Sequence, residues 1–204
     1  MAKIKLTKNE LKKEKDALKM YQRYLPTLQL KKQQLQVEVR SVQTRLEQLE
    51  ARKATLEKEY DVWVAVFSEQ QKARTLDGEP LLRISSLKTD TGNIAGVAIP
   101  IFQDVEFERL AYDLYATPPW VDSALTLMEQ LLRTGMELEV VSRQGDLLAH
   151  ELRITTQRVN LFEKVKIPET IADIRKIRIY LGDQQTAQVV RGKIAKRKVE
   201  GAER

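Results

Sequence analysis

Lysine and arginine side chains near the two ends of the chain are the residues best suited to bind something. Residues 1–35 hold ten Lys or Arg against three Asp or Glu, and residues 175–204 hold nine against three. The segment between them holds sixteen against twenty-three, so a net charge of +6 combines two basic ends with an acidic middle. Clustered cations attract acidic partners over long range, which leaves nucleic acid, an anionic membrane and an acidic protein surface as alternatives.

The sequence contains few residues suited to catalysis or cofactor binding. Cysteine is absent and His150 is the single histidine, which excludes thiolate sites, His-pair metal sites and most His-based triads. No glycine pattern matches a phosphate-binding loop. We therefore expect no catalytic residue, no cofactor and no metal, and we interpret His150 as a surface residue.

Compartment and membrane contact can also be addressed from composition. The lack of cysteine fits a reducing compartment, and the first fifteen residues lack the apolar core of a secretory signal. The longest uncharged apolar run, at 94–102, is too short to span a bilayer. We expect a cytoplasmic protein.

A long heptad pattern extends from the basic front end toward the middle of the chain. With Leu11 at position a, the a and d residues form an apolar stripe as far as Trp63 and Phe67. The stripe is interrupted only at Glu14, Lys32 and Lys53. A period of 3.5 residues predicts a left-handed supercoil with a partner helix.

The limits of this first helix follow from local signals. Thr7 with Glu10 three residues later predicts a capping box, and no glycine occurs before Gly78. Pro26 falls at position b, on the outer face, where a kink leaves the apolar stripe intact. We expect a helix from about residue 7 to 75, roughly 100 Å long at 1.5 Å per residue.

The middle of the chain changes character. Residues 81–87 and 94–102 are predicted as short strands on either side of a TDTGN turn at 89–93. A head of about 40 residues is too small to be stable without the helices attached to it.

A second helical segment follows Thr117, a predicted N-cap, and Pro118 and Pro119. Small residues at Thr134, Gly145 and Thr155 fill gaps in its stripe. Past Phe162 the stripe shifts by one residue, at Pro168, so we expect a change of register within a continuing helix. The predicted stripe is Ala124, Leu127, Leu131, Leu138, Val141, Leu148, Leu152, Val159 and Phe162, then Ile167, Ile171, Ile174 and Leu181.

Two heptad helices separated by a head fold back most simply on each other. We therefore predict a mainly α fold, a long two-stranded antiparallel left-handed coiled-coil hairpin with a small inserted, partly β head. The predicted parts are an N-terminal helix at 1–75, the head with its β-hairpin at 76–119 and a C-terminal helix at 120–204. Both basic ends then reach the same end of the hairpin, although a parallel dimer also satisfies the heptads.

Several motifs point to one family. These are RVN at Arg158-Val159-Asn160 followed by Ile167-Pro168, a basic KIAKRK segment near the end, LTKNELKKEK near the start, and GVAIP from Gly96 to Pro100. Across almost the whole chain the sequence resembles the D subunit of the A-type and V-type ATPases, the central rotor shaft of a rotary motor.

The resemblance implies a set of partners. A hexamer of alternating catalytic and non-catalytic subunits would surround the shaft, a small companion rotor subunit would bind the head, and a connecting subunit would link the shaft to the membrane ring. The shaft would bind neither nucleotide nor nucleic acid, and would belong to the soluble V1/A1 sector at the membrane periphery.

The resemblance also suggests which residues meet the hexamer. We expect a basic tip inside it, and we expect the Thr155–Ile177 stretch, which contains the RVN…IP motif, to set the bend and twist of the shaft as it enters the hexamer. Two other interpretations are a basic coiled-coil arm that binds nucleic acid and a purely structural dimeric coiled coil. The basic tip comprises Lys5, Lys8, Lys12, Lys193, Lys196 and Arg197.

Overall fold

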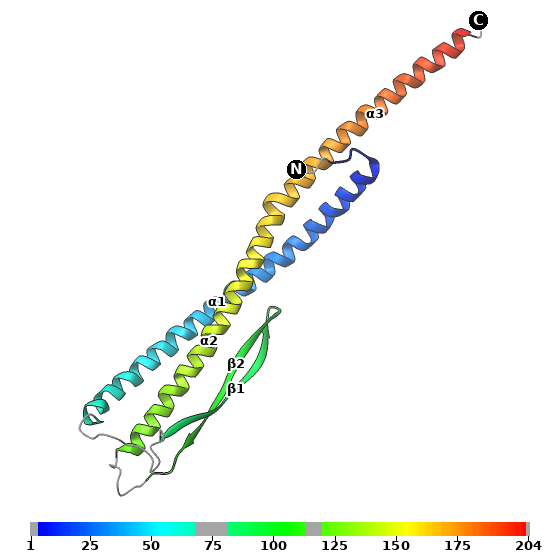
Figure 1. The fold of residues 1–204 in the computed structure, drawn as a ribbon. Coiled ribbons are helices and arrows are strands. Elements are labelled where there is room, and N and C mark those ends of the chain that lie inside the picture. The colour runs from blue at the N-terminus through cyan, green and yellow to red at the C-terminus, as the bar shows by residue number, and fades with distance from the viewer. Residues whose placement is uncertain (1–3, 68–80, 113–119, 203–204) are drawn as a thin grey trace. The chain divides into compact units, whose positions relative to one another are not determined.

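The computed structural model describes residues 4–67, 81–112 and 120–202. It confirms a mainly α fold with one two-stranded sheet (Figure 1). Residues Met1–Lys32 and Ile154–Arg204 form one compact unit, here called the terminal unit, and Gln33–Arg153 form the central unit. In chain order the elements are α1 (Lys8–Phe67), β1 (Leu82–Ile94), β2 (Val97–Arg109), α2 (Val121–Leu161), the π-helix η1 (Phe162–Lys166) and α3 (Ile167–Ala202).

Helix α1 begins at the predicted cap. The Thr7 hydroxyl accepts the backbone N–H of Glu10 at 3.3 Å, and the Thr7 carbonyl accepts the N–H of Leu11 at 3.0 Å. The Glu10 carboxylate pairs with Lys13 at 3.3 Å, and the Thr7 N–H donates to the Lys5 carbonyl. The cap is therefore a single side-chain bond.

Three parts of the sequence prediction lie outside the described residues. These are the predicted end of the first helix at 68–75, the side chains of Trp63 and Phe67, and the predicted cap at 117–119.

The apolar stripe of α1 is confirmed. Every a and d side chain from Leu11 to Tyr60 is buried or half-buried, including Glu14, Lys32 and Lys53. Pro26 is exposed, as its b position predicts. The stripe therefore continues past a helix-internal proline, because the ring lies on the outer face. The most buried members are Leu35, Val42, Leu49 and Leu56.

In the central unit α1 and α2 pack antiparallel around one core. Gly145 lies beside Val42, and Arg45 forms an ion pair of 2.6 Å with Glu137. Later residues of α1 therefore contact earlier residues of α2, which is the antiparallel arrangement that the hairpin prediction requires. The core residues are Leu35, Val42, Leu49, Ile99, Val141 and Leu148.

The β-hairpin turn lies at Ala95–Gly96, so the predicted TDTGN turn is wrong. Both turn residues have positive φ, 51° and 80°, as a two-residue type I′ turn requires, and the Asn93 side chain accepts the Gly96 N–H at 2.9 Å. The TDTGN segment lies inside β1, whose Gly92 faces Ile99. A Cβ at Gly92 would lie 2.5 Å from Cδ1 of Ile101, so glycine there makes room for a neighbouring side chain.

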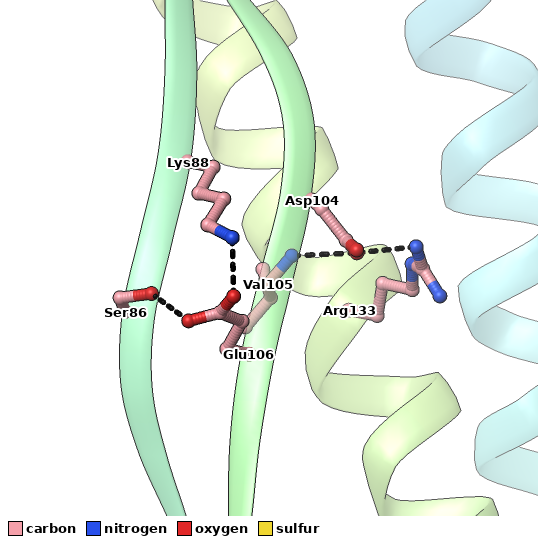
Figure 2. Close-up of polar contacts among 6 residues, drawn as sticks. All are labelled: Ser86, Lys88, Asp104, Val105, Glu106 and Arg133. Atoms are coloured by element: carbon pink, nitrogen blue, oxygen red, sulfur yellow. Dashed lines mark hydrogen bonds and ion pairs between the residues drawn. The ribbon is translucent and has the colours of Figure 1, made fainter.

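The hairpin is fixed to α2 by both apolar and polar contacts. Ile99 of β2 joins the core, the Gln144 amide donates to the Pro100 carbonyl, and Asp104 forms an ion pair with Arg133 (Figure 2). Asp104 also accepts its neighbour's N–H, from Val105, at 2.8 Å. These contacts hold the strands along the helix, and they account for a hairpin of two 13-residue strands where shorter ones were predicted.

A second cluster covers the start of α2. Leu81 packs with Val121 and Leu125, and Tyr112 donates a hydrogen bond to Asp122. That hydrogen bond raises the pKa of Tyr112. The heptad pattern had not placed Val121 and Leu125 in the core, because they face the hairpin side of the helix and not α1.

Polar contacts also tie the hairpin strands to each other. Glu106 of β2 accepts hydrogen bonds from Lys88 and, at 2.8 Å, from the Ser86 hydroxyl of β1 (Figure 2). The bond with Lys88 holds the pKa of Glu106 below its usual range, and the same bond raises the pKa of Lys88. These groups are exposed, so the cluster secures strand register more than stability.

The ion pair between Arg109 and Glu129 makes stability dependent on pH. Two bonds of 2.5 and 2.8 Å lower the pKa of Glu129. We expect Glu129→Gln to lower the free energy of unfolding at neutral pH by less than about 1 kcal/mol, because Arg109 is 44% exposed.

A carboxyl with a depressed pKa stabilises the fold above its unfolded pKa of about 4.3. The deficit of Glu129→Gln should therefore disappear as pH falls through the lower folded pKa. Urea unfolding across pH 2–7 measures this, with Glu57→Gln as the control, because Glu57 is exposed and pairs with Lys53 at the longer distance of 3.5 Å. A deficit that stays constant across that range would contradict the assignment.

Gly145 allows a test of how closely α1 and α2 approach. A Cβ there would lie 3.4 Å from Cγ1 of Val42, an ordinary contact, and glycine inside a helix costs about 0.5–1 kcal/mol relative to alanine. Gly145→Ala should therefore raise the free energy of unfolding by about that amount in chemical denaturation. The control is Gly135→Ala, whose Cβ would meet nothing within 4 Å. A loss at Gly145 beside a gain at Gly135 would mean that the helices need glycine to approach.

Candidate functional site

The five residues of η1 lie between the two parts of the RVN…IP motif. At the end of this segment the Ile167 N–H donates to the carbonyl of Phe162, five residues back, where an α-helix bonds four residues back. A π turn adds one residue to the helix and rotates everything after it relative to everything before.

That extra residue accounts for the predicted change of register, which is confirmed. The pairs of equivalent buried positions are fifteen residues apart, one more than two heptads: Thr155 and Thr170, and Val159 and Ile174. Ile177 is fully buried in the same way, fifteen residues after Phe162. Ile171, predicted in the stripe, is exposed instead, while Thr170 and Ile177 had been missed.

The charges in α3 explain why the extra residue is needed. Continuing the heptads without it would place Glu169, Asp173 and Lys176 against α1. Burying an unpaired charge costs several kcal/mol, far more than one irregular helical turn. The π turn places Thr170 and Ile174 there instead.

Pro168 gives a second reason for the irregular turn. Proline lacks an N–H, and in a regular α-helix its ring meets the carbonyl four residues back, at a cost of about 3 kcal/mol. Pro168 comes directly after the π segment and is exposed. The wider turn therefore lets the helix continue through a proline, as α3 does to Ala202.

An aromatic contact fixes the π segment against α1. The rings of Tyr21 and Phe162 lie 5.3 Å apart between centroids, tilted by 32°. Phe162 is the first residue of η1, so this contact, with the buried Val159 before it, holds the start of the irregular turn in place.

The motif residues divide by exposure. Val159 is buried and Ile167 half-buried, whereas Arg158, Asn160 and Pro168 are exposed. The first two therefore support the packing of the terminal unit. The exposed three leave a guanidinium, a side-chain amide and a proline ring accessible on its surface.

All six basic-tip residues are exposed. Lys8 and Lys12 lie in the first turns of α1 and Lys5 lies just before it, whereas Lys193, Lys196 and Arg197 lie in the last turns of α3. All residues of 182–199 are exposed, and Figure 1 shows this last part of α3 extending past the start of α1. The two halves of the predicted tip are therefore staggered along α3 and do not form one cluster.

A groove between α1 and α3 in the terminal unit was not found from the sequence. It has a volume of about 640 Å³ and combines an aliphatic floor with four exposed cations. The sequence feature that could have indicated this groove is the spacing of its cations. Lys15 and Lys19 are four residues apart and Arg175 and Arg178 are three apart, which places each pair on one helix face. The lining residues are Lys15, Leu18, Lys19, Gln22, Ile171, Ile174, Arg175, Arg178 and Ile179.

Within 4–67, 81–112 and 120–202, no three His, Cys, Asp or Glu side chains gather closely enough to hold a metal ion. In the same part of the chain, no helix is both long and apolar enough to cross a membrane.

Removing the extra residue tests its role in the fold. Deleting the exposed Lys164 together with Pro168→Ala should give a regular α-helix that still places Thr170, Ile174 and Ile177 against α1. We expect its Tm, followed by circular dichroism, to equal or exceed that of the unmodified chain. Deletion of Lys164 alone should melt lower, because Pro168 then lies in a regular helix.

A matched deletion provides the control. Removing Lys176, which is also exposed, moves Ile177 off the α1 side and should lower Tm clearly. If the Lys164 deletion with Pro168→Ala melted as low as the Lys176 deletion, the register account of the π turn would be wrong.

The chain is similar to known proteins over most of its length. Residues 10–197 match the family model that describes the D subunit of ATP synthase. The D subunit of the V-type ATP synthase of Borreliella burgdorferi is 50% identical over 196 residues, covering 96% of this chain and 95% of the relative. The proteins of the same name from Chlamydia pneumoniae and Chlamydia trachomatis serovar L2 are 35% and 36% identical over 197 residues, covering 97% of this chain and 93% and 96% of theirs. The chain, with its heptad helices, inserted hairpin and RVN…IP motif, therefore belongs to the family of V-type ATP synthase D subunits.

Proposed function

We propose that the chain is the non-catalytic central stalk, or rotor shaft, of a V/A-type rotary ATPase. It would couple ATP hydrolysis or synthesis in the catalytic hexamer to proton or sodium transport through the membrane rotor. The observation that carries the proposal is the family match over residues 10–197. The helices support it, because a π turn keeps their heptad contacts in register.

Torque transmission needs an element that resists twisting. The packed seam of each unit resists sliding of one helix on the other, because a one-residue slip would bring charged residues inward. Thr155 and Thr170, both buried, continue the seam of the terminal unit on either side of the π turn. Both features support a role in transmitting rotation.

The exposed cations support contact with the hexamer. The basic tip presents lysine and arginine at the start of α1 and along the end of α3. Long-range attraction between charges draws a partner in without the deep interlocking contacts that would hold one angle. Different faces of the shaft would then favour different nucleotide states of the catalytic subunits, which is population shift by differential contact.

The other partners follow from the same proposal. The hairpin and the start of α2 would bind the small companion rotor subunit, and a connecting subunit would join the chain to the membrane ring. The chain would be cytoplasmic and peripheral to the membrane, and neither nucleotide nor nucleic acid would be its ligand.

The decisive experiment mixes the purified chain with the catalytic hexamer, with and without a non-hydrolysable ATP analogue. We expect one chain per hexamer by native mass spectrometry and a changed ATPase rate. Alanine at all six basic-tip positions should weaken the complex, and the difference from the unmodified chain should shrink as salt is raised.

Two results would count against the proposal. Equal affinity of the tip variant and the unmodified chain at low salt would remove the role of the tip. Absence of any hexamer complex, together with tight salt-sensitive binding to single-stranded nucleic acid, would favour the basic coiled-coil arm.

A further inference from the structure

We infer that the groove between α1 and α3 binds an acidic segment of the catalytic hexamer that carries an aliphatic side chain. The inference rests on the proposed function, and names the chemistry of a contact separate from the basic tip. It is argued from the groove's charge, its floor and the position of α3 after the π turn.

The cations of the groove lack a counter-charge. Lys15, Lys19, Arg175 and Arg178 are exposed, and the lining contains no Asp or Glu. Among the described residues, none of these four side chains forms an ion pair or hydrogen bond. Some cations elsewhere in the described chain have a carboxylate partner, such as Arg45 with Glu137 and Arg109 with Glu129. The groove differs because four cations line one hollow that holds no carboxylate. Four unpaired cations facing one groove favour an anionic occupant.

The floor of the groove indicates which kind of anion. It is formed by Leu18, Ile171, Ile174 and Ile179, and no aromatic side chain lines it. Nucleic acid bound without sequence preference stacks its bases on aromatic rings, which this floor does not offer. Carboxylates that flank an aliphatic side chain would satisfy both the rim and the floor. The observations therefore favour a protein segment.

The π turn produces this surface. Because the extra residue turns Ile174 inward, Ile171 and Ile179 remain 48% and 56% exposed on the outer side, with Arg175 between them. A second hollow of about 590 Å³ lies on the other side of this row and adds Pro168, Ala172 and Lys176 to its lining. The row formed by Ile171, Arg175 and Ile179 is therefore accessible from both sides, as a docking surface requires.

The groove is formed on one side of the terminal unit, where α1 contributes Lys15 and Lys19 and α3 contributes Arg175 and Arg178. A hexamer of alternating subunits presents three equivalent copies of any acidic segment. One chain would therefore engage one copy at a time, and a turn of the shaft would pass the groove to the next. The charges of the basic tip are spread along two helix ends, so the tip alone would not select one of the three copies.

The test compares variants of the full chain for binding to the purified hexamer. Alanine at Lys15, Lys19, Arg175 and Arg178 should weaken binding at least about tenfold at low salt, since each lost charge contact contributes modestly and the four add. Ile171→Ser with Ile179→Ser should also weaken binding, by a factor that does not depend on salt. All six positions are exposed, so each variant should keep the Tm of the unmodified chain.

Matched controls separate the groove from general charge. Alanine at Lys13, Arg23, Arg153 and Lys164 removes four exposed cations from outside the groove and should leave the affinity within about twofold. Zero-length carbodiimide coupling should join Lys15 or Lys19 to an Asp or Glu of the hexamer, and mass spectrometry of the product identifies the acidic segment.

Each failure has its own signature. If the unmodified chain binds the hexamer but the groove variants bind equally well, the groove inference is wrong and the proposed function stands. A groove-dependent preference for single-stranded oligonucleotide over the hexamer would replace the acidic segment with nucleic acid. If the unmodified chain does not bind the hexamer at all, the proposed function fails, and the inference fails with it.

Discussion

The requirement that two apolar stripes keep facing each other governs this structure. Leu35, Val42 and Leu49 of α1 meet Val141 and Leu148 of α2 in a regular heptad arrangement. The sequence after Phe162 does not continue that arrangement, since the next four inward positions are all charged: Lys166, Glu169, Asp173 and Lys176. One extra residue in a π turn restores an apolar contact at lower cost than burying those charges. The position of every side chain in α3 depends on that turn.

Much of this arrangement could be predicted because a heptad is a local signal. The stripe of α1, the outward Pro26, the Thr7 cap and the register change near Pro168 depend on residues within one or two turns of each other. The direction and size of the register change were correct. Its new buried set was only partly correct: Ile174 is buried as predicted, but the exposed Ile171 was chosen over the polar Thr170, and Ile177 was missed.

What escaped prediction depends on contacts between distant segments. The hairpin turn uses Ala95 at positive φ, which no preference of alanine would indicate, and the strands are fixed by Gln144 and Arg133 more than 25 residues away. Val121 and Leu125 are buried by Leu81, which precedes them by 40 residues or more. The groove likewise combines two helix ends from opposite ends of the chain. A pattern within one helix cannot show which face a hairpin or a second helix will cover.

The last turns of α3 have a consequence for how a complex is assembled. From residue 182 to 199 every side chain is exposed, so burial of side chains contributes little to the stability of the helix there. Most of the stability of a helix in a protein comes from tertiary packing, which this segment lacks. A partner that encloses this end supplies the missing burial, so part of its binding free energy is spent on ordering the helix. Association at this end is therefore partly a folding reaction, in which the partner acts as a template and dissociation begins with fraying from the C-terminus.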